Sequence, residues 1–229
     1  GHNRPVEMPM QPTRSALLLA LALAAAPALA QQNLNTISDD LVARAGQAYG
    51  NLDTVSGDIS IQAGAKVRTV NTVSGDIELA EGATTGRLET VSGDIEGARD
   101  ITASGGAGTV SGDIFFDRGS QLGGGVETVS GDIGLVGTRV AGDIETVAGD
   151  VTVGIGSHVK GGIRIEKNEN GRFGGNGKPP RIVIGPNAVV EGALVFERPV
   201  ALYVHSSAKI GRVSGATPRS FDTPTAPQD

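Results

Sequence analysis

Six near-identical hexapeptides run through the middle of the sequence, and they restrict the chain to a repetitive fold. Thr-Val-Ser-Gly-Asp-Ile occurs five times, and a softened copy, Thr-Val-Ala-Gly-Asp-Val, follows. The glycines of the six copies are Gly57, Gly75, Gly93, Gly112, Gly131 and Gly149, so the copies lie 18 or 19 residues apart. A short fixed period of this kind is typical of a stack in which each repeat packs on the next.

Side chains within each copy are expected to alternate, as they do in a β-strand. Val55, Gly57 and Ile59 would share one face, and Thr54 and Ser56 would share the other. Apolar positions also recur every six residues, and three six-residue sides make one coil of about 18 residues. The sequence therefore predicts an all-β fold: a single-stranded, three-sided parallel β-solenoid (β-helix), right-handed like most parallel crossovers.

The composition fits a narrow coil and excludes several kinds of protein. The 229 residues include 35 Gly, no Trp and only 3% aromatic residues, while 38% are hydrophobic. Such a coil has room for stacked Val, Ile and Leu but little for large rings. The absence of Cys excludes disulfides and thiol nucleophiles. The formal net charge of −6 argues against a nucleic-acid partner.

The first 30 residues have the pattern of a secretory signal peptide. Arg14 precedes an apolar run, Ala16–Ala26, which is followed by Pro27 and Ala28-Leu29-Ala30. A positive residue, a short apolar stretch and small residues at the end are typical of such leaders. We therefore expect cleavage near Ala30 and a mature protein that is exported to the periplasm or the extracellular space, with no transmembrane segment.

The rest of the chain divides into three expected parts. Residues 31–50 lack the repeat, and Ser38 is placed to begin a short N-terminal capping helix. Residues 51–215 would form the solenoid of about eight coils, interrupted by a Gly/Asn/Pro-rich surface loop at 168–180. Residues 216–229 are polar and Pro-rich, which predicts a disordered tail.

Two family resemblances follow from these motifs. The run of Val-Ser-Gly-Asp-Ile copies between Asn51 and Val153 resembles a bacterial adhesin-like β-solenoid domain family of unknown function. The segments Ile155–Glu166 and Ile184–Glu197 resemble bactofilins, which are polymer-forming bacterial solenoids. Both resemblances imply a right-handed solenoid, and neither family supplies catalytic residues to transfer to this chain.

An acidic column is the first candidate site. If the coils stack in register, the aspartates of the six copies lie above one another; these are Asp58, Asp76, Asp94, Asp113, Asp132 and Asp150. The functional interpretation is a ladder of cation or ligand sites, with calcium as the candidate cation. The structural interpretation, which we favour, is that each carboxylate accepts backbone N–H groups and organises its turn.

A hydroxyl ladder is the second candidate site. It would contain Thr54, Thr72, Thr90, Thr109, Thr128, Ser56, Ser74, Ser92, Ser111 and Ser130. Such an array could bind a glycan, but ordinary cross-strand pairing of hydroxyls is the interpretation that we favour. Glycan binding usually adds an exposed aromatic ring. Alternation predicts one, Phe115 facing outward, while Phe116 faces inward.

Enzymatic interpretations are weaker. After the leader only His158 and His205 remain, too few for a three-histidine metal site. His158 could be the general base of a hexapeptide-type acyltransferase, but the bulky residues of the main repeats do not fit that pattern. A carbohydrate-active site with an arginine base would need Arg68, Arg87 or Arg139 beside the acidic column.

The sequence thus favours an exported, non-catalytic β-solenoid that acts as a structural or surface-interaction protein of the cell envelope. Its partner would be an envelope or extracellular glycan or protein, and no cofactor besides calcium is indicated. The alternative is a self-assembling, bactofilin-like scaffold. A carbohydrate-active or hexapeptide-type enzyme is the minor alternative.

Overall fold

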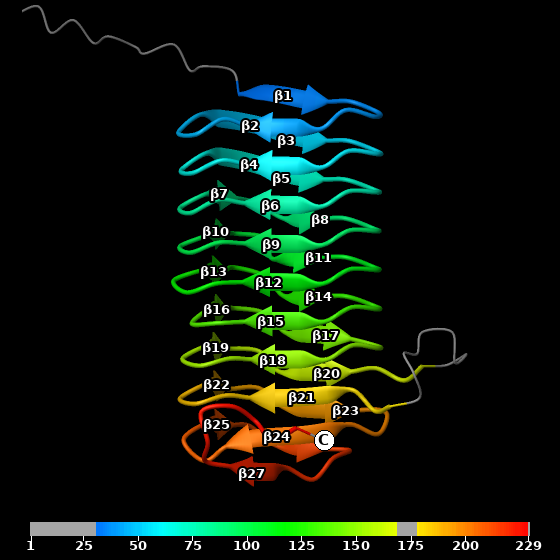
Figure 1. Cartoon of the computed structure of the whole chain (residues 1–229), viewed down its shortest axis with the longest axis vertical. Coiled ribbons are helices and arrows are strands. Elements are labelled where there is room, and N and C mark those ends of the chain that lie inside the picture. The colour runs from blue at the N-terminus through cyan, green and yellow to red at the C-terminus, as the bar shows by residue number, and fades with distance from the viewer. Residues whose placement is uncertain (1–30, 169–177, 229) are drawn as a thin grey trace, which may run out of the picture. The chain divides into compact units, whose positions relative to one another are not determined.

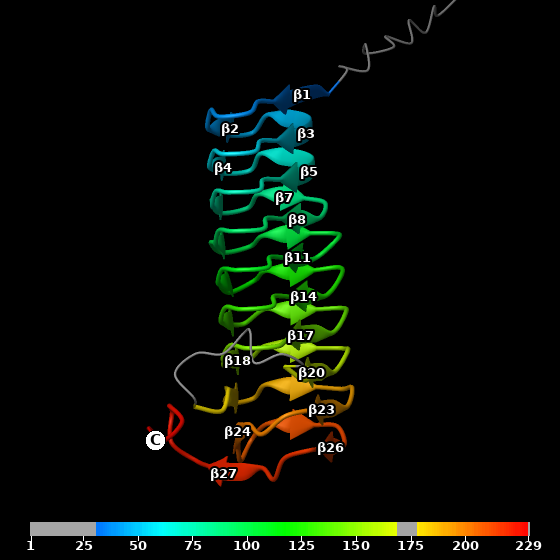
Figure 2. The same cartoon turned by 90° about the vertical axis from the view of Figure 1, so that its right-hand side faces the viewer.

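The computed structural model describes residues 31–168 and 178–228; the predicted signal peptide lies outside them. The described chain is all-β, with no helix in these two ranges. It forms a parallel β-solenoid of about 10 turns, which follow one another about 18 residues apart (Figure 1 and Figure 2). The predicted solenoid class is therefore confirmed.

One sheet is a single ladder in which each strand pairs with the strand one coil later. Its ten strands, in order, are β2 (Leu41–Ala43), β4 (Ile59–Ile61), β6 (Ile77–Leu79), β9 (Ile95–Gly97), β12 (Ile114–Phe116), β15 (Ile133–Leu135), β18 (Val151–Val153), β21 (Arg181–Ile184), β24 (Ala201–His205) and β27 (Arg219–Phe221). All of its pairings are parallel, as the single-stranded coil requires.

The second sheet has 17 strands and contains two ladders, joined in the first coils by β3 (Ala48–Asp53) and β5 (Lys66–Asn71), with β1 (Gln32–Asn35) at its start. Ladder 1 consists of β7 (Thr84–Thr85), β10 (Thr102–Ala103), β13 (Gln121–Leu122), β16 (Arg139–Val140), β19 (His158–Val159), β22 (Val189–Val190) and β25 (Lys209–Ile210). Ladder 2 consists of β8 (Leu88–Glu89), β11 (Ala107–Gly108), β14 (Val126–Glu127), β17 (Ile144–Thr146), β20 (Ile163–Ile165), β23 (Leu194–Phe196) and β26 (Val213–Ser214).

The core consists of aliphatic side chains stacked from coil to coil. In the 10-stranded sheet the isoleucine that ends each hexapeptide is at most 1% exposed and pairs in register with its counterpart one coil later. Full burial of such a side chain stabilises a fold by roughly 1.5–3 kcal/mol. The alternation predicted for β12 is confirmed: Phe116 is fully buried, whereas Phe115 is 38% exposed.

The hexapeptide itself is not a strand, which corrects the predicted faces. In the five full copies only the last residue lies in a strand, and the five before it form the bend that joins the two sheets; in the softened copy Thr146 also belongs to β17. Alternation does not apply to a bend, so the threonines turn into the coil and the valines face solvent. Thr54, Thr72, Thr90, Thr109 and Thr128 are only 4–6% exposed. Val55, Val73, Val91 and Val110 are 40–46% exposed.

A hydrogen bond between coils explains why the threonines are buried. The Thr90 hydroxyl donates to the carbonyl oxygen of Gly75 in the preceding coil, at 3.0 Å, and Thr109 bonds Gly93 in the same way. The glycines allow the coils to approach closely at this bend. A Cβ on Gly93 would overlap the Gly75 carbonyl oxygen, so no larger residue fits there. The expected surface ladder of Thr hydroxyls is therefore wrong, while its serines are exposed or half-buried.

The N-terminal segment is a coil of the solenoid, not a capping helix. Leu41 and Ala43 are buried and Val42 is exposed, which is the alternation of a strand. Strand β2 pairs with β4, with Leu41 in register with Ile59. The helix was expected because this segment lacks the hexapeptide, but backbone pairing to the next coil does not need that motif. This added coil is one reason why the stack exceeds the expected eight turns.

The C-terminal tail is also ordered, contrary to the sequence-based expectation. Strand β27 pairs with β24, and Phe221 is only 7% exposed. Arg219 donates to the Tyr203 hydroxyl at 3.0 Å. The buried Phe221 ring and the hydrogen bond from Arg219 hold this polar segment on the outer face of the last coils.

The predicted surface loop leaves the ladder intact. Residues 169–177 lie outside the described ranges, and Lys178 and Pro179 are exposed. Strand β21 then pairs with β18, with Val151 in register with Ile182. The insertion therefore adds chain between two coils without shifting the register of the stack.

The buried threonines provide a matched pair of substitutions. Thr109→Val removes a hydroxyl that bonds the Gly93 carbonyl, whereas the buried Thr146 hydroxyl has no hydrogen-bond partner. We expect Thr109→Val to lower the free energy of unfolding by about 1 kcal/mol and Thr146→Val to leave it unchanged or raise it. Chemical denaturation of both variants measures this. Equal losses in the two would contradict the proposed role of the hydroxyl.

Candidate functional site

The six predicted aspartates occupy equivalent bends and form one hydrogen-bonded column. The backbone N–H of each donates to a carboxylate oxygen of the aspartate one coil earlier, at 2.7–2.9 Å. Asp40 begins the column, and the Arg181 N–H bonds Asp150 at its other end. The carboxylates thus satisfy backbone donors where the two sheets meet, as the structural interpretation predicts.

The column shows no preformed metal centre. Within residues 31–168 and 178–228, no group of three or more His, Asp or Glu side chains converges to hold a metal ion. One oxygen of each aspartate in the column is committed to a backbone N–H group. Calcium binding along the column stays a prediction.

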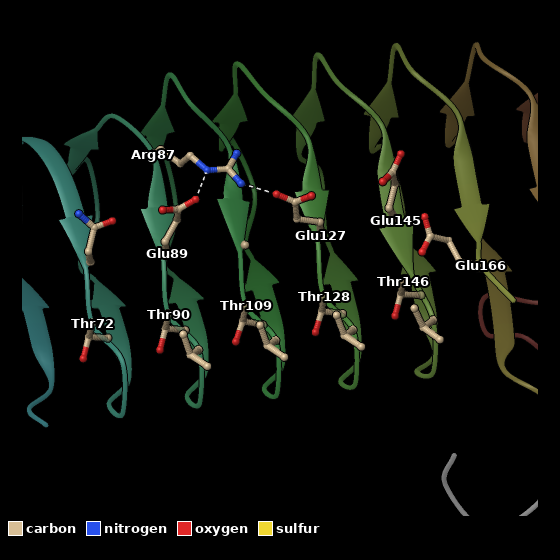
Figure 3. Close-up of a pocket in the computed structure, with 16 residues that line it drawn as sticks. Thr72, Arg87, Glu89, Thr90, Thr109, Glu127, Thr128, Glu145, Thr146 and Glu166 are labelled. Atoms are coloured by element: carbon tan, nitrogen blue, oxygen red, sulfur yellow. Dashed lines mark hydrogen bonds and ion pairs between the residues drawn. The ribbon is translucent and has the colours of Figure 1, made fainter. Parts of the chain in front are cut away.

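A groove on ladder 2 is a stronger candidate site, and it is not one of the sites predicted from the sequence. It encloses about 580 Å³ and runs across the coils of β5, β8, β11, β14, β17 and β20 (Figure 3). Buried threonines lie along it, with carboxylates on one side and valines on the other. It is lined by Asn71, Thr72, Arg87, Glu89, Thr90, Val91, Gly108, Thr109, Val110, Glu127, Thr128, Val129, Glu145, Thr146, Val147 and Glu166.

Three of these carboxylates belong to a glutamate that directly precedes a buried threonine, whereas Glu166 follows β20. Strand pairing places Glu89, Gly108, Glu127 and Glu145 at the same position of successive coils. Coils of a parallel sheet are about 4.8 Å apart, so these side chains form a second acidic column. The sequence signal that could have found it is the Glu before the Thr-Val pair, which recurs in three of the six copies.

Arg87 partly neutralises the first half of this column, since one guanidinium is shared by two carboxylates. Its guanidinium donates to Glu89 at 2.5 Å and also contacts Glu127, as the dashed lines in Figure 3 show. The two glutamates are two coils apart, and the position between them is Gly108. A Cβ there would lie 3.4 Å from the guanidinium, so the glycine leaves space for it. The hydrogen bond to Glu89 and the contact with Glu127 raise the pKa of Arg87, which keeps it charged.

The second half of the column has excess negative charge. Burial raises the pKa of Glu145 above its ordinary value, and the nearby charges of Glu166, Asp143 and Glu127 raise it further. Arg164 acts in the opposite direction, but it forms its ion pair with Glu197, at 2.8 Å. Figure 3 shows the side chains of Glu145 and Glu166 close together. Arg164, which the figure does not draw, is the register neighbour of Glu145 in the next coil. A cationic group placed here would relieve this repulsion.

The exposed valines give the groove an apolar side. Val91 and Val110 are 45% and 40% exposed, and Val129 and Val147 continue the line half-buried. Exposed β-branched side chains in one line are unusual on a water-facing surface and mark an interaction site more often than a single exposed residue does. The groove therefore presents a line of carboxylates and, parallel to it, a line of apolar valine side chains.

The residues considered for catalysis do not all gather in one place, although Arg139 and His158 are register neighbours on ladder 1. His158 contacts Glu191 at 2.5 Å, and His205 lies against Ser207 and the Phe221 ring. Arg68 donates to the Asn51 side chain, at 3.1 Å. Arg87 is beside the Glu column of the groove rather than the Asp column, so the arrangement foreseen for a carbohydrate-active enzyme is not formed by this residue.

Comparison of the chain with protein-family models, with curated proteins and with solved structures found no match. In the part of the chain that the structure describes, no helix is long and apolar enough to cross a membrane. The function proposed below therefore rests on the surface features of the solenoid.

The raised pKa of Glu145 predicts a pH-dependent stability difference. Because the folded state disfavours the charged carboxyl, that carboxyl costs stability as pH rises from the ordinary Glu range through its raised value. We expect Glu145→Gln to raise the melting temperature by about 1–2 °C near neutral pH, and to have no effect near about pH 3.5, where the native carboxyl is protonated. Differential scanning calorimetry at both pH values measures this.

Glu197→Gln is the matched control, because Glu197 is paired with Arg164. We expect it to lower the melting temperature slightly near neutral pH. A Glu145→Gln variant that is less stable than the native protein near neutral pH would show that the carboxylate is favourably paired in the groove.

Proposed function

We propose that this protein is an exported, non-catalytic β-solenoid that binds an elongated partner at the cell envelope, in the manner of an adhesin-like surface-interaction module. The signal-peptide pattern in residues 1–30 supports export, and the hexapeptide repeats support the adhesin-like resemblance. We further propose that its coil is three-sided and right-handed. Two ladders in one sheet and a third ladder in the other support the three sides.

The observation that carries this proposal is the groove on ladder 2. It extends over several coils rather than closing around a small molecule, so its occupant is a chain that runs along the stack. The carboxylates of Glu127, Glu145 and Glu166 attract positive charge, and the valine line accepts apolar groups. A peptide segment of a protein partner, in extended conformation and with basic and apolar residues, has both properties.

A designed peptide tests this chemistry directly. We expect a fluorescein-labelled peptide of alternating Lys and Val to bind the chain of residues 31–229, with an affinity that falls as salt is raised. Replacing Glu127, Glu145 and Glu166 together by Gln should weaken binding about tenfold or more, since each removed charge pair contributes up to about 1 kcal/mol. Fluorescence anisotropy measures both constants.

The control removes the same number of charges elsewhere. Glu78, Glu81 and Glu96 are exposed and do not line the groove, so their joint replacement by Gln should change the affinity less than twofold. Equal weakening by the two triple variants would show that net charge, and not the groove, attracts the peptide. Absence of binding to the native chain would contradict the proposal as well.

The alternative function, a self-assembling scaffold, is supported by the first coil. Ile37 is 75% exposed and Val42 is 43% exposed, and β2 has a paired neighbour on one side only. An unpaired strand edge with apolar side chains favours strand-to-strand association. If the alternative holds, sedimentation velocity of residues 31–229 will show oligomers that Val42→Lys dissolves. A monomer at high concentration excludes the scaffold.

A further inference from the structure

A second hollow lies on ladder 1, a different strand ladder from the acidic groove. It encloses about 550 Å³ and crosses the coils of β10, β13, β16 and β19. Small residues, including Gly123 and Ala141, line it. Its polar residues are Thr102, Ser104, Gln121, Arg139, His158 and Lys160.

This hollow has the opposite charge to the groove. None of the described carboxylates lines it, although the chain as a whole carries a net charge of −6. Within residues 31–168 and 178–228, the side chains of Arg139 and Lys160 form no ion pair, and both are exposed. Arg139 has no carboxylate at its register neighbours, Gln121 and His158. Lys160 follows Val159, which pairs with Val190, so Glu191 lies beside it in the next coil and also contacts the His158 ring at 2.5 Å. Arg139 is therefore the cation that faces the hollow without a counter-charge, and Lys160 adds a second positive group at its edge.

The register of ladder 1 arranges the polar groups in a line. Thr102 pairs with Gln121, Gln121 with Arg139, and Arg139 with His158, each in the next coil. Lys160 lies two residues after His158, on the same face of the chain. The hollow thus presents hydroxyl, amide and cationic groups about 4.8 Å apart along the stack, which suits a linear molecule with repeating polar units.

We propose that this hollow binds a linear polysaccharide that carries carboxylate groups. The Arg139 guanidinium is shaped to form two parallel hydrogen bonds with one carboxylate, and the Lys160 ammonium adds a second positive charge. The Thr102 hydroxyl and the Gln121 amide provide partners for sugar hydroxyls. This site is independent of the basic-peptide groove and does not rest on the function proposed for it.

The surface favours a glycan over an anionic membrane. The large apolar side chains that are exposed on the described chain, such as Val91, Phe115 and Ile155, do not line this hollow. Without them the surface has nothing to insert between lipids. A concave lining of hydroxyl, amide and cationic side chains instead suits a single chain of sugars.

Isothermal titration calorimetry with octameric polygalacturonate tests the proposal. We expect the chain of residues 31–229 to bind this probe and not a neutral malto-oligosaccharide of the same length. The joint substitution Arg139→Gln and Lys160→Gln should lower the affinity about tenfold, equivalent to about 1.4 kcal/mol. Both residues are exposed, so the variant should unfold at the same temperature as the native protein, which calorimetry checks.

Lys66→Gln with Lys209→Gln is the matched control. Both lysines lie on the same sheet, in the column continued by Thr84 and Val189, but they do not line the hollow. The control should bind the polygalacturonate within twofold of the native chain. Equal loss in both double variants, or no binding by the native chain, would overturn the proposal. Binding to phosphatidylserine vesicles in place of polygalacturonate would overturn it too, in favour of a membrane surface.

Discussion

The close approach of successive coils at the glycine bend is the constraint on which the rest of the structure depends. At Gly93 the coil lies so near the Gly75 carbonyl that no β-carbon fits between them. The same carbonyl accepts the Thr90 hydroxyl, and the adjacent Asp94 N–H bonds the carboxylate of Asp76. Glycine therefore allows the coils to approach to strand spacing. Threonine and aspartate form hydrogen bonds to the backbone polar groups that this close approach buries between the coils. A short motif repeated at a constant interval follows directly from this requirement.

Because the coils are in register, any outward position of the repeat becomes a column on the surface. The column before the buried threonine gives the acidic groove, and the column of exposed valines gives its apolar side. On ladder 1 another column gives the hollow with Arg139. The solenoid thus converts small differences between copies into surfaces of different charge, while the core changes little from coil to coil. Function in such a fold is expected on these outer columns.

Much of the fold could be predicted from the sequence, because the constant period and the recurring isoleucines both indicate coils that stack in register. The sides of Phe115 and Phe116 and the hydrogen-bonding role of the aspartates also follow from the sequence. The faces of Thr90 and Val91 could not be deduced from alternation, since they lie in a bend where a hydroxyl–carbonyl bond decides which side chain turns inward. The first coil was missed because Leu41 pairs with Ile59 through its backbone, without the motif. The groove was missed because it depends on Arg87 reaching across the space above Gly108, which only the coil geometry reveals.

Thermal unfolding of Gly93→Ala tests the stacking of the glycine bend most directly, with Ser92→Ala as the reference because Ser92 is exposed. A methyl group at position 93 would press against the backbone of the coil before it. Overpacking costs roughly 1–3 kcal/mol, and contact with backbone rather than with a flexible side chain places this substitution at the upper end, about 3 kcal/mol. We expect Gly93→Ala to melt at least about 6 °C below the native protein, and Ser92→Ala to melt at nearly the native temperature. Equal melting temperatures for the two variants would show that the coils accept a side chain at this bend and are not stacked as closely as described.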